Sequence, residues 1–448
     1  MTNAGTLRNR RSLICRERAE LMGLSALYGV VLNMYYPRLS QELRLPEYPY
    51  NPPDWEMWLL SWCLYLLPIF WMPTRLTKPS QGILWIIYIV LFAPTMFMPN
   101  FVLQMDAHSI AFYTSYIFAM FNIMVASTYV RPIRVVRIRV SLMLYFFLIS
   151  LLFTMLVSII VYSFGFNFRF VSIYDVYDVR SEYKDKLQEL GTLTAYAVPA
   201  VSNSLAPLLG ALGIFLLRTP WRRAGFVLII MSLSAQLYIF TLAGFKTALF
   251  SVLAVWFLFL LLGKRNPIHL IIISLLFLYT LSFFVFSLGD NLLFLGILRR
   301  VFVIPGIQSA YYYEYFSINP PVLLGHSILK GFSEQPQTPP AFLIGYAYYG
   351  RLETSANANF WADGFANFRF VGVLIVTLML AALLWVVDSV SSKHALRFTL
   401  PALVTAAYTL TNSALSTTLI THGLLLTLLL LWFAPPLMEP TPLRRSWT

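Results

Sequence analysis

The 448-residue chain is 58% hydrophobic and only 11% charged, with a mean hydropathy of +0.70. A soluble domain carries about 25% charged residues, so this chain has too little polar surface to cover itself in water, and a sizeable soluble domain is excluded. The net charge is +13 and the pI about 9.7, but the basic residues lie in short clusters between apolar runs, which argues against a nucleic-acid-binding surface.

Apolar runs long enough to cross a bilayer as helices follow one another along the chain. The basic N-terminal segment precedes a first apolar run without a small-residue cleavage site, so we expect a retained anchor and not a cleaved signal peptide. The sequence therefore predicts an all-α fold, one polytopic integral membrane domain over residues 1–448 with about 12 transmembrane helices. In chain order, the predicted spans cover residues 20–37, 56–73, 82–99, 108–129, 140–165, 191–217, 223–240, 244–262, 267–289, 370–389, 397–413 and 416–434.

The last two spans come from one apolar run, residues 401–434, which is longer than a single span needs. We divide it at Thr411-Asn412-Ser413, where polar residues predict a tight hairpin. The two cysteines, Cys15 and Cys63, lie in the N-terminal segment and within a predicted span, so they predict neither a disulfide framework nor a metal site.

The distribution of charge predicts the orientation of the spans. With the N-terminus in the cytoplasm and the spans alternating, 20 of the 32 Lys and Arg residues but only 4 of the 19 acidic residues fall in inside segments. Cytoplasmic loops of membrane proteins carry an excess of Lys and Arg, so we expect both termini to be cytoplasmic. Orientation alone explains these basic clusters, without a lipid-binding or partner-binding role.

Two predicted outer loops are long. The smaller one, residues 166–190, mixes acidic and basic residues and is typical of a solvated helical surface. The larger one, residues 290–369, is rich in aromatic residues, unlike a disordered segment. We therefore expect it to fold against the membrane face, where Tyr and Trp suit both the interface and the faces of sugar rings.

The adjacent pair Arg299-Arg300 opposes the positive-inside bias, because it lies in an outer segment. The planar guanidinium fork matches phosphate oxygens, which favours pyrophosphate binding, and snorkelling toward lipid headgroups is the alternative. Neighbours on an α-helix differ by about 100°, so we expect only one of the two to face a given ligand. Lys246, at the outer end of a span, either snorkels or adds positive potential to the same anion site.

His326 is a candidate general base, since imidazole titrates near neutral pH, although a structural role is the alternative. A dense polar set precedes the span at 370–389, namely Asn357, Asn359, Asp363 and Asn367. These side chains either cap a helix and form turns or bind sugar hydroxyls, and Asp363 is a second candidate base.

The stretch Asn357-Ala358-Asn359-Phe360-Trp361-Ala362-Asp363-Gly364-Phe365-Ala366-Asn367-Phe368, followed by Val371-Gly372-Val373, resembles the end of the large external loop in Wzy-type O-antigen polymerases, also called oligosaccharide repeat unit polymerases. The family often has glycine where this chain has Arg369. The stretch from Arg300 to Pro305, followed by Tyr311 to Phe316, is similar to the start of the same loop. Gly244-Phe245-Lys246 and the segment 416–423 also resemble family sites, so the resemblance covers roughly residues 240–430.

The resemblance implies a fold similar to that of O-antigen ligases and of membrane glycosyltransferases of the C superfamily. It implies a metal-independent enzyme on the periplasmic face of the bacterial inner membrane. Such enzymes join oligosaccharide repeat units carried on undecaprenyl pyrophosphate, by adding the growing chain to the non-reducing end of the incoming unit. The implied partners are the lipid-linked oligosaccharide, membrane lipid and, as a candidate, a chain-length regulator protein.

On this hypothesis each chemical task falls to candidate residues of the outer face. Cations stabilise a pyrophosphate leaving group, and this task falls to Lys246, Arg299 and Arg300, with Arg351 in reserve. The acceptor hydroxyl must be oriented and deprotonated, which falls to His326 or Asp363. Sugar binding falls to Tyr311, Tyr312, Glu314, Asn357 and Asn359.

Three other functions remain open. An O-antigen ligase uses the same donor with a different acceptor, and the Asn/Asp-rich stretch favours the polymerase. A flippase for lipid-linked sugars is a transporter, a class that usually shows internal repeats and charges deep in spans, whereas this sequence shows no repeat and few such charges. A structural subunit of an envelope complex would not need the arginine-containing loop.

Overall fold

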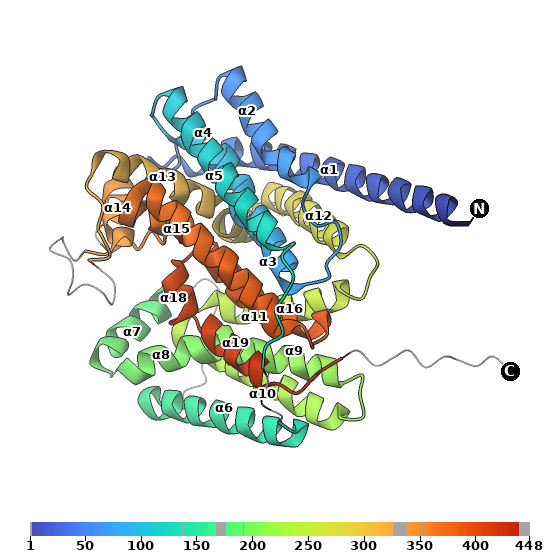
Figure 1. The fold of residues 1–448 in the computed structure, drawn as a ribbon. Helices are drawn as coiled ribbons and strands as arrows, with labels where there is room; N and C mark the ends of the chain where they lie inside the picture. The colour runs from blue at the N-terminus through green and yellow to red at the C-terminus, as the bar shows by residue number, and fades with distance from the viewer. Residues whose placement is uncertain are drawn as a thin grey trace.

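The computed structural model describes residues 2–136, 138, 140–166, 176–190, 192–325, 338–351 and 353–438. It is 77% helix, and no strand occurs in the described residues, which confirms the all-α prediction for them. Figure 1 shows the helices packed side by side in a single bundle, with the N-terminal half of α1 extending beyond it.

Eight helical segments in the described residues are long and apolar enough to cross a membrane. They are Pro79–Val102 (α3 Pro79–Ile87, η2 Tyr88–Phe92 and α4 Ala93–Val102), Ala107–Ser127 (α5), Leu142–Phe164 (α6), Leu193–Leu216 (within α8 Thr192–Ala200, η3 Val201–Leu205 and α9 Ala206–Leu216), Arg222–Ala243 (α10), Pro267–Ser287 (α12), Leu292–Ile318 (η4 Leu292–Val303 and α13 Ile304–Ile318) and Phe360–Ser391 (α15). The remaining helices are α1 Thr2–Leu43, α2 Trp55–Leu66, η1 Leu67–Phe70, α7 Val176–Glu189, α11 Lys246–Leu261, α14 Pro340–Tyr349, α16 Leu396–Ala402, α17 Val404–Leu410, α18 Leu415–Leu419 and α19 Leu424–Phe433.

Seven of these eight segments coincide with predicted spans. The other five predicted spans fall on helices that are too short or too polar to meet the same measure, which are α1, α2 with η1, α11, α16 with α17, and α18 with α19. The eighth segment, Leu292–Ile318, lies inside the region expected to be an outer loop. The helical content agrees with a polytopic membrane protein, and eight of the described segments are long and apolar enough to be spans, so the predicted count of about 12 is not confirmed.

Exposed aromatic residues mark both ends of the short segment formed by α2 and η1. Trp55 is 72% exposed at its start, and Phe70 and Trp71 are 54% and 38% exposed at its end. Trp and Tyr gather at membrane interfaces, and the fifteen or so residues between them rise about 24 Å as a helix. This segment therefore fits a bilayer despite its length.

Segments predicted to share the inside of the membrane meet at one end of the bundle. Arg75 forms an ion pair with Glu17 of α1 at 2.8 Å. The Lys78 ammonium donates to the carbonyl oxygen of Thr128 at 3.0 Å and lies 3.8 Å from the carboxylate of Asp388 near the end of α15. These contacts connect inside segments that are far apart in the sequence, so the predicted sorting of loops to two ends agrees with the fold.

The C-terminal apolar run makes a hairpin. The helix α17 ends at Leu410, and the chain turns at Thr411-Asn412-Ser413, where the split between two spans was predicted. Ala395, before α16, donates its backbone N–H to the carbonyl of Leu437, after α19, at 2.6 Å. The chain therefore leaves and returns to the same end of the bundle.

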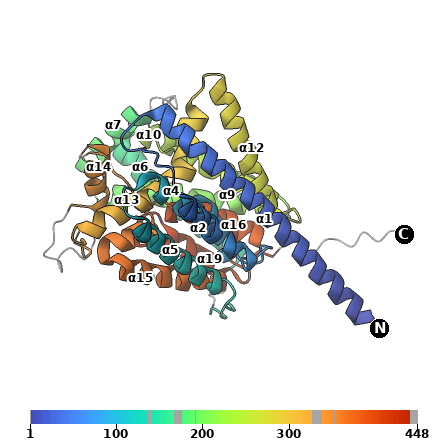
Figure 2. The same ribbon diagram turned by 90° about the horizontal axis from the view of Figure 1, so that it is seen from above.

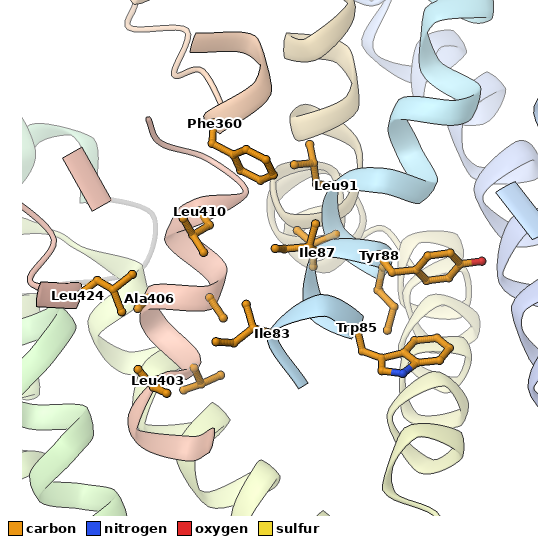
Figure 3. Close-up of a cluster of buried hydrophobic side chains, with 14 of the residues drawn as sticks. Ile83, Trp85, Ile87, Tyr88, Leu91, Phe360, Leu403, Ala406, Leu410 and Leu424 are labelled. Atoms are coloured by element: carbon orange, nitrogen blue, oxygen red, sulfur yellow. The ribbon is translucent and has the colours of Figure 1, made fainter. Parts of the chain in front are cut away.

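The segment Pro79–Val102 is the centre of the bundle, with 94% of its hydrophobic window buried. Figure 3 shows Ile83 and Ile87 facing Leu403, Ala406 and Leu410 of the C-terminal hairpin. Trp85 and Tyr88 point to the opposite side. Viewed from above, α1 packs along α12 at the edge of this core (Figure 2).

The region expected to be the large outer loop re-enters the bundle, and η4 forms its inward arm. Phe294, near the start of η4, packs against Phe286 and Phe283 with ring centroids 4.5 and 5.2 Å apart. Phe302, near its end, lies 5.8 Å from Tyr279, one to two turns earlier in α12. Later residues of η4 thus meet earlier residues of α12, so η4 runs back antiparallel to α12.

The helix α13 is the returning arm of this first re-entrant hairpin. A Cβ at Gly306 would lie 2.7 Å from the backbone of Pro94, so only glycine permits this approach of α13 to α4. Farther along, the carboxylate of Glu314 accepts from the N–H of Gln104, beyond the end of α4, at 3.4 Å. Hence α13 runs parallel to α4 and back outward.

This hairpin was not predicted from the sequence because the composition of its two arms is mixed. Its inward arm is apolar except for Arg299-Arg300, and its outward arm is rich in tyrosine. Both features are typical of an interfacial loop, yet the structure buries most of α13 against α4 and α15. Irregular and polar helices are tolerated at membrane depth where they are covered by protein.

A second re-entrant hairpin lies at the start of α15. The backbone leaves helical geometry at Phe368 (φ −143°, ψ 24°) and Arg369 (φ 53°, ψ −139°). A Cβ at Gly364 would lie 2.8 Å from the carbonyl oxygen of Gly372, so the two arms touch backbone to backbone. The short arm 360–367 therefore folds back along the long arm 370–391, which coincides with the predicted span 370–389.

Candidate functional site

The two predicted arginines lie on η4, which is a π-helix of twelve residues. π-Helices are rare, mostly single turns, and frequent at functional sites. Arg299 is half-buried, and its guanidinium carbon lies 5.4 Å above the ring of Tyr48 in a cation–π contact. Arg300 is exposed. The two arginines thus have different surroundings, and only Arg300 presents its side chain to the outside.

Arg299 carries a polar atom without a partner. Its Nε is buried and has no hydrogen-bond acceptor among the described residues. A buried donor that is left unsatisfied costs roughly 1–3 kcal/mol, and such groups in native proteins often mark a ligand or ordered water. Arg299 therefore combines a packing role against Tyr48 with an unused donor.

A layer of tyrosines covers the outward arm beside the arginines. Tyr311 is buried, stacks on Tyr348 with centroids 4.0 Å apart, and donates its hydroxyl to the carbonyl of Glu47 at 2.9 Å. Tyr348 donates to the carboxylate of Glu314 at 2.7 Å. Burial raises the pKa of Tyr348. These contacts join α13 and α14 to the first outer loop, residues 44–54.

Gln308 and Tyr349 form the polar centre of this layer. The Nε2 of Gln308 donates to the Tyr349 hydroxyl at 2.8 Å. Gln308 is only 3% exposed, and its Oε1 is buried without a hydrogen-bond partner in the described chain. Burial also raises the pKa of Tyr349. The negative charge of Glu47 adds to this rise, and the positive charge of Arg300 opposes it. We call Glu47, Tyr48, Arg300, Gln308 and Tyr349, with Arg299, the outer polar cluster.

Two predicted sugar-binding residues are used in the fold. Asn359 is 1% exposed and caps α15, because its Oδ1 accepts from the N–H groups of Trp361 and Ala362 at 3.0 Å. Its Nδ2 donates to Pro305 at 3.3 Å and to the Ser309 hydroxyl at 2.7 Å. Both polar atoms of its side chain are therefore occupied, and it links the N-terminal end of the short arm 360–367 to the first re-entrant hairpin.

Tyr312 is also committed internally, since it is fully buried and donates to the carbonyl of Ala356 at 2.9 Å. Asn357 and Arg351 are exposed on the outer face and remain accessible to a ligand. Arg351 follows α14, which carries Tyr349.

Asp363 is half-buried in the first turn of α15. A carboxylate is favoured there by the helix dipole, so a structural role is available to it. Its charge acts on Tyr312 of α13. Asn367 holds the chain nearby, because its Oδ1 accepts from the N–H of Leu324 at 2.8 Å.

Lys246 begins α11, beside a second outer patch. The carbonyl of Gly244 accepts from Arg180 of α7 at 3.5 Å, and the Arg180 guanidinium lies 5.6 Å from the Phe245 ring. Tyr183 packs edge-on against the same ring at 5.5 Å, and burial raises the pKa of Tyr183 to about 12. The residues before Lys246 thus contact α7, whereas Arg299 contacts Tyr48 of the first outer loop.

His326 lies outside the described residues, so its place relative to the cluster is not given by the structure. Within the described chain, no group of three His, Cys, Asp or Glu side chains is arranged to hold a metal ion.

Four members of the outer polar cluster were not predicted from the sequence. They are Glu47, Tyr48, Gln308 and Tyr349. Glu47 and Tyr48 belong to a Pro- and Tyr-rich linker between the first two predicted spans, and an acidic residue beside an aromatic one on the outer face was the available signal. Gln308 was detectable as an amide within an otherwise apolar and aromatic run.

The described residues form an all-helical protein with eight helical segments long and apolar enough to cross a membrane. At one end of the bundle, the outer polar cluster brings arginine and tyrosine side chains together. In comparisons with known proteins, no family model, no curated protein and no solved structure matches the chain.

Proposed function

We propose that this chain is a membrane glycosyltransferase that joins undecaprenyl-pyrophosphate-linked oligosaccharide repeat units into a surface polysaccharide. The observation that carries the proposal is Arg300, exposed beside buried tyrosines on a re-entrant π-helix at the end of the bundle opposite the basic loops. A cation at this end faces the side where lipid-linked saccharides are polymerised. The proposed location is the bacterial inner membrane, with the site periplasmic and both termini cytoplasmic.

The proposed reaction first requires that the leaving pyrophosphate be stabilised. Arginine binds phosphate oxygens through two parallel N–H donors, and fixed cations stabilise charge that develops on a leaving group. Arg300 is exposed for this contact, and the buried Nε of Arg299 offers a further donor next to it. Arg351 and Lys246 are supplementary cations on the same face, and we assign them to more distant phosphate or sugar groups.

The reaction also requires that the saccharide be bound and oriented. Sugar rings stack on aromatic faces and bind through their hydroxyls. Tyr311 and Glu314 belong to the tyrosine layer, and Asn357 is exposed next to Ala356, whose carbonyl accepts from Tyr312. Because Tyr312 and Asn359 are committed to internal hydrogen bonds, we assign them to shaping the site and not to contacting sugar.

Finally, the reaction requires a base that accepts the proton of the acceptor hydroxyl. His326 and Asp363 are the candidates that the sequence suggests. The half-buried position of Asp363, whose charge acts on Tyr312 of α13, supports it as a proposal. A chain-length regulator protein is a further proposed partner.

Deletion of the gene in the native host tests the function. Analysis of the surface polysaccharide together with the lipid-linked pool separates the possible activities. Single repeats that reach the surface without long polymer would support the polymerase. Long polymer retained on its carrier would indicate a ligase, and single lipid-linked units trapped on the cytoplasmic face would indicate a flippase. An unchanged profile would overturn the proposal.

A further inference from the structure

We propose that the end of the bundle predicted to be cytoplasmic binds one anionic phospholipid, with its phosphate at Arg218 and Arg397 and one acyl chain in a pocket between α9, α10 and α11. The sequence explains the basic residues of this end by orientation alone. The structure adds a specific arrangement, because it gathers two of them around one aromatic ring and places a pocket farther along the same helix. The inference goes beyond the proposed function and does not depend on it.

Two arginines and one phenylalanine form the headgroup end of the proposed site. Arg218 follows α9, Arg397 lies in the first turn of α16, and Phe259 is near the end of α11. The guanidinium carbons of Arg218 and Arg397 lie 5.0 and 5.5 Å from the centre of the Phe259 ring. The ring attracts each cation, but two cations that share one ring repel each other. An anion bound to both arginines would offset this repulsion.

Both arginines reach the surface at this end. Arg218 is exposed and Arg397 is half-buried. A Cβ at Gly263, which is exposed just after α11, would overlap Nη2 of Arg397, so this guanidinium lies across the bare backbone of the glycine. The Phe259 ring is buried beneath the two cations. The arginines therefore present charge toward the membrane surface, above an apolar floor.

The positive charge of this end is not balanced by nearby acidic residues. The segments 217–223, 262–266 and 392–397 hold seven Lys and Arg residues and no Asp or Glu. Among the described acidic residues predicted to lie on this side, Glu17, Glu20 and Asp388 already interact with Arg75, Arg16 and Ser80, respectively. Arg218 forms no ion pair in the part of the chain that the structure describes. A lipid phosphate would supply the missing negative charge.

The hydrocarbon end of the proposed site is a small pocket between α9, α10 and α11, with about 250 Å³ of space including its open mouth. Gly210 forms part of its floor, because a Cβ there would lie 3.0 Å from the Ser232 hydroxyl and 3.8 Å from Val255. The hydroxyls of Ser232 and Ser251, which also line the pocket, donate to backbone carbonyls at 2.6 and 2.7 Å. The lining therefore offers hydrocarbon contacts and suits an acyl chain better than a polar ligand.

The pocket opens between exposed apolar side chains of α10 and α11. Leu233 and Trp256 line the pocket and are exposed, and their neighbours Ile230 and Leu253 are exposed as well. The helix α10 is long and apolar enough to cross a membrane. An exposed apolar side of such a helix faces the hydrocarbon of the bilayer, so a lipid chain is the occupant that can enter from this side.

The two ends of the site lie close enough for one lipid molecule. Val252, Val255 and Phe259 share one side of α11, because residues three, four and seven apart lie on the same helix face. At 1.5 Å per residue, Val255 and Val252 are about 6 and 10 Å from Phe259 along the axis. In a phospholipid only the glycerol separates the phosphate from the first chain carbons, so a molecule held at Phe259 can place a chain in the pocket.

Charge and hydrocarbon together select the class of ligand. Basic pockets between membrane helices on the cytoplasmic side bind anionic lipid headgroups. A zwitterionic phospholipid would fill the pocket but carries no net charge for the arginines. An acidic protein segment would match the charge but has no chain for a pocket that opens into the bilayer. An anionic phospholipid matches both ends.

The test uses the purified full-length chain in phosphatidylcholine nanodiscs that contain a trace of phosphatidylglycerol with a photoreactive diazirine in its acyl chain. Phosphatidylcholine with the same diazirine is the lipid control. After illumination, mass spectrometry locates the labelled peptides, with and without excess unlabelled phosphatidylglycerol or soluble glycerol phosphate. The variants are Arg218→Ala, Arg397→Ala and Val252→Phe, and Arg134→Ala is the matched control, an exposed arginine in another basic loop of this end. Thermal unfolding midpoints without anionic lipid report folding.

We expect the phosphatidylglycerol probe to label peptides from residues 229–256 and to be displaced by unlabelled phosphatidylglycerol, while the phosphatidylcholine probe labels them weakly. Arg218→Ala should lower this labelling about fivefold, because one cation near an anionic lipid contributes roughly that factor in affinity. Arg397→Ala should act likewise, and Arg218→Ala carries the test alone if Arg397→Ala does not fold. Arg134→Ala should leave the labelling unchanged. Val252→Phe fills the pocket and should remove the label from it.

Equal labelling by the two probes would overturn the inference, because the site would then not select charge. An equal loss in Arg218→Ala and Arg134→Ala would also overturn it, since the charge of the whole end would be responsible. Displacement by glycerol phosphate, together with unchanged labelling in Val252→Phe, would show a headgroup contact without a chain site and would contradict the role of the pocket. None of these measurements involves polymer formation, so the proposed function is tested separately.

Discussion

The Trp361 indole Nε1 donates a hydrogen bond to the Thr377 hydroxyl at 3.0 Å, although sixteen residues separate the two. In a straight helix they would lie about 24 Å apart. Both side chains are buried, with Trp361 1% and Thr377 0% exposed. This bond closes the second re-entrant hairpin, and it holds the N-terminus of the short arm deep in the bundle, against the tip of the first hairpin.

The turn of that hairpin predicts a stabilising substitution. Arg369 has φ 53° and ψ −139°, a conformation that is essentially restricted to glycine and costs other residues about 1–3 kcal/mol. Arg369→Gly removes this strain but adds freedom to the unfolded chain, worth about 0.5–1 kcal/mol in the opposite direction. We expect a net gain of about 1 kcal/mol, measured as a higher thermal unfolding midpoint in detergent.

Arg369→Ala is the control for this prediction. It removes the long side chain, whose Nη2 lies 3.5 Å from the carbonyl of Asn319, but keeps the Cβ that causes the strain. Its midpoint should therefore not exceed that of the wild type. A midpoint for Arg369→Gly at or below that of Arg369→Ala would contradict the strained turn.

Asn359 predicts a large loss of stability. Asn359→Ala removes a helix cap, worth about 0.5–2 kcal/mol, and leaves the buried partners on the other hairpin without their donor, at a further cost of roughly 1–3 kcal/mol. Asn359→Ser keeps a capping oxygen without burying a charge and loses the amide donors, so its midpoint should fall between those of Asn359→Ala and the wild type. An Asn359→Ala protein as stable as the wild type would show that the two hairpins are not coupled through this residue.

The two arginines predict different phenotypes. Arg300→Ala should reduce polymer formation about 100- to 1,000-fold, the usual cost of one donor at a developing charge, and leave the unfolding midpoint unchanged because Arg300 is exposed. Arg300→Lys should restore part of the activity by keeping the charge without the fork. Arg299→Ala should also lower stability, by about 0.5–1 kcal/mol, through loss of its contact with Tyr48. Equal effects of Arg299→Ala and Arg300→Ala on both activity and midpoint would contradict the division of roles.

The ion pair between Arg75 and Glu17, at the end of the bundle that is predicted to be cytoplasmic, should make the stability depend on pH. The hydrogen bond from Arg75 lowers the pKa of Glu17 below its ordinary value of 4.5, against the opposing effect of burial. A lowered carboxyl pKa stabilises the folded state above about pH 4.5, and this stabilisation is lost as the pH falls through the lower folded value. Unfolding midpoints of the wild type and Glu17→Gln should therefore differ near pH 7 and converge in strong acid. A difference that persists unchanged in acid would contradict the assignment.

Much of the helical layout follows from the sequence. Apolar runs and their basic flanks locate the helices, because bilayer thickness fixes their length and Lys and Arg sort to one side. Thr411-Asn412-Ser413 also predicts the turn in the C-terminal run, since polar residues interrupt it where one span would be complete. These signals are local in the sequence, so they can be recognised without knowledge of tertiary contacts.

The re-entrant hairpins were not predictable from the same signals. Whether Leu292–Ile318 lies on the surface or enters the bundle depends on contacts such as that of Gly306 with Pro94, more than 200 residues away. The resemblance singled out position 369 as a frequent glycine, and the structure supplies a physical reason in its positive φ. Glu47 was missed because its neighbour in space, Tyr311, is more than 260 residues distant in sequence.

The most direct test of the proposed function is reconstitution of the purified full-length chain in proteoliposomes with the lipid-linked repeat units of its host. The products to measure are the length of the saccharide and the release of undecaprenyl pyrophosphate. Our account predicts a ladder of polymer with one carrier released per joined unit, and loss of both with Arg300→Ala. Movement of intact single units across the membrane, without joining and without carrier release, would contradict it.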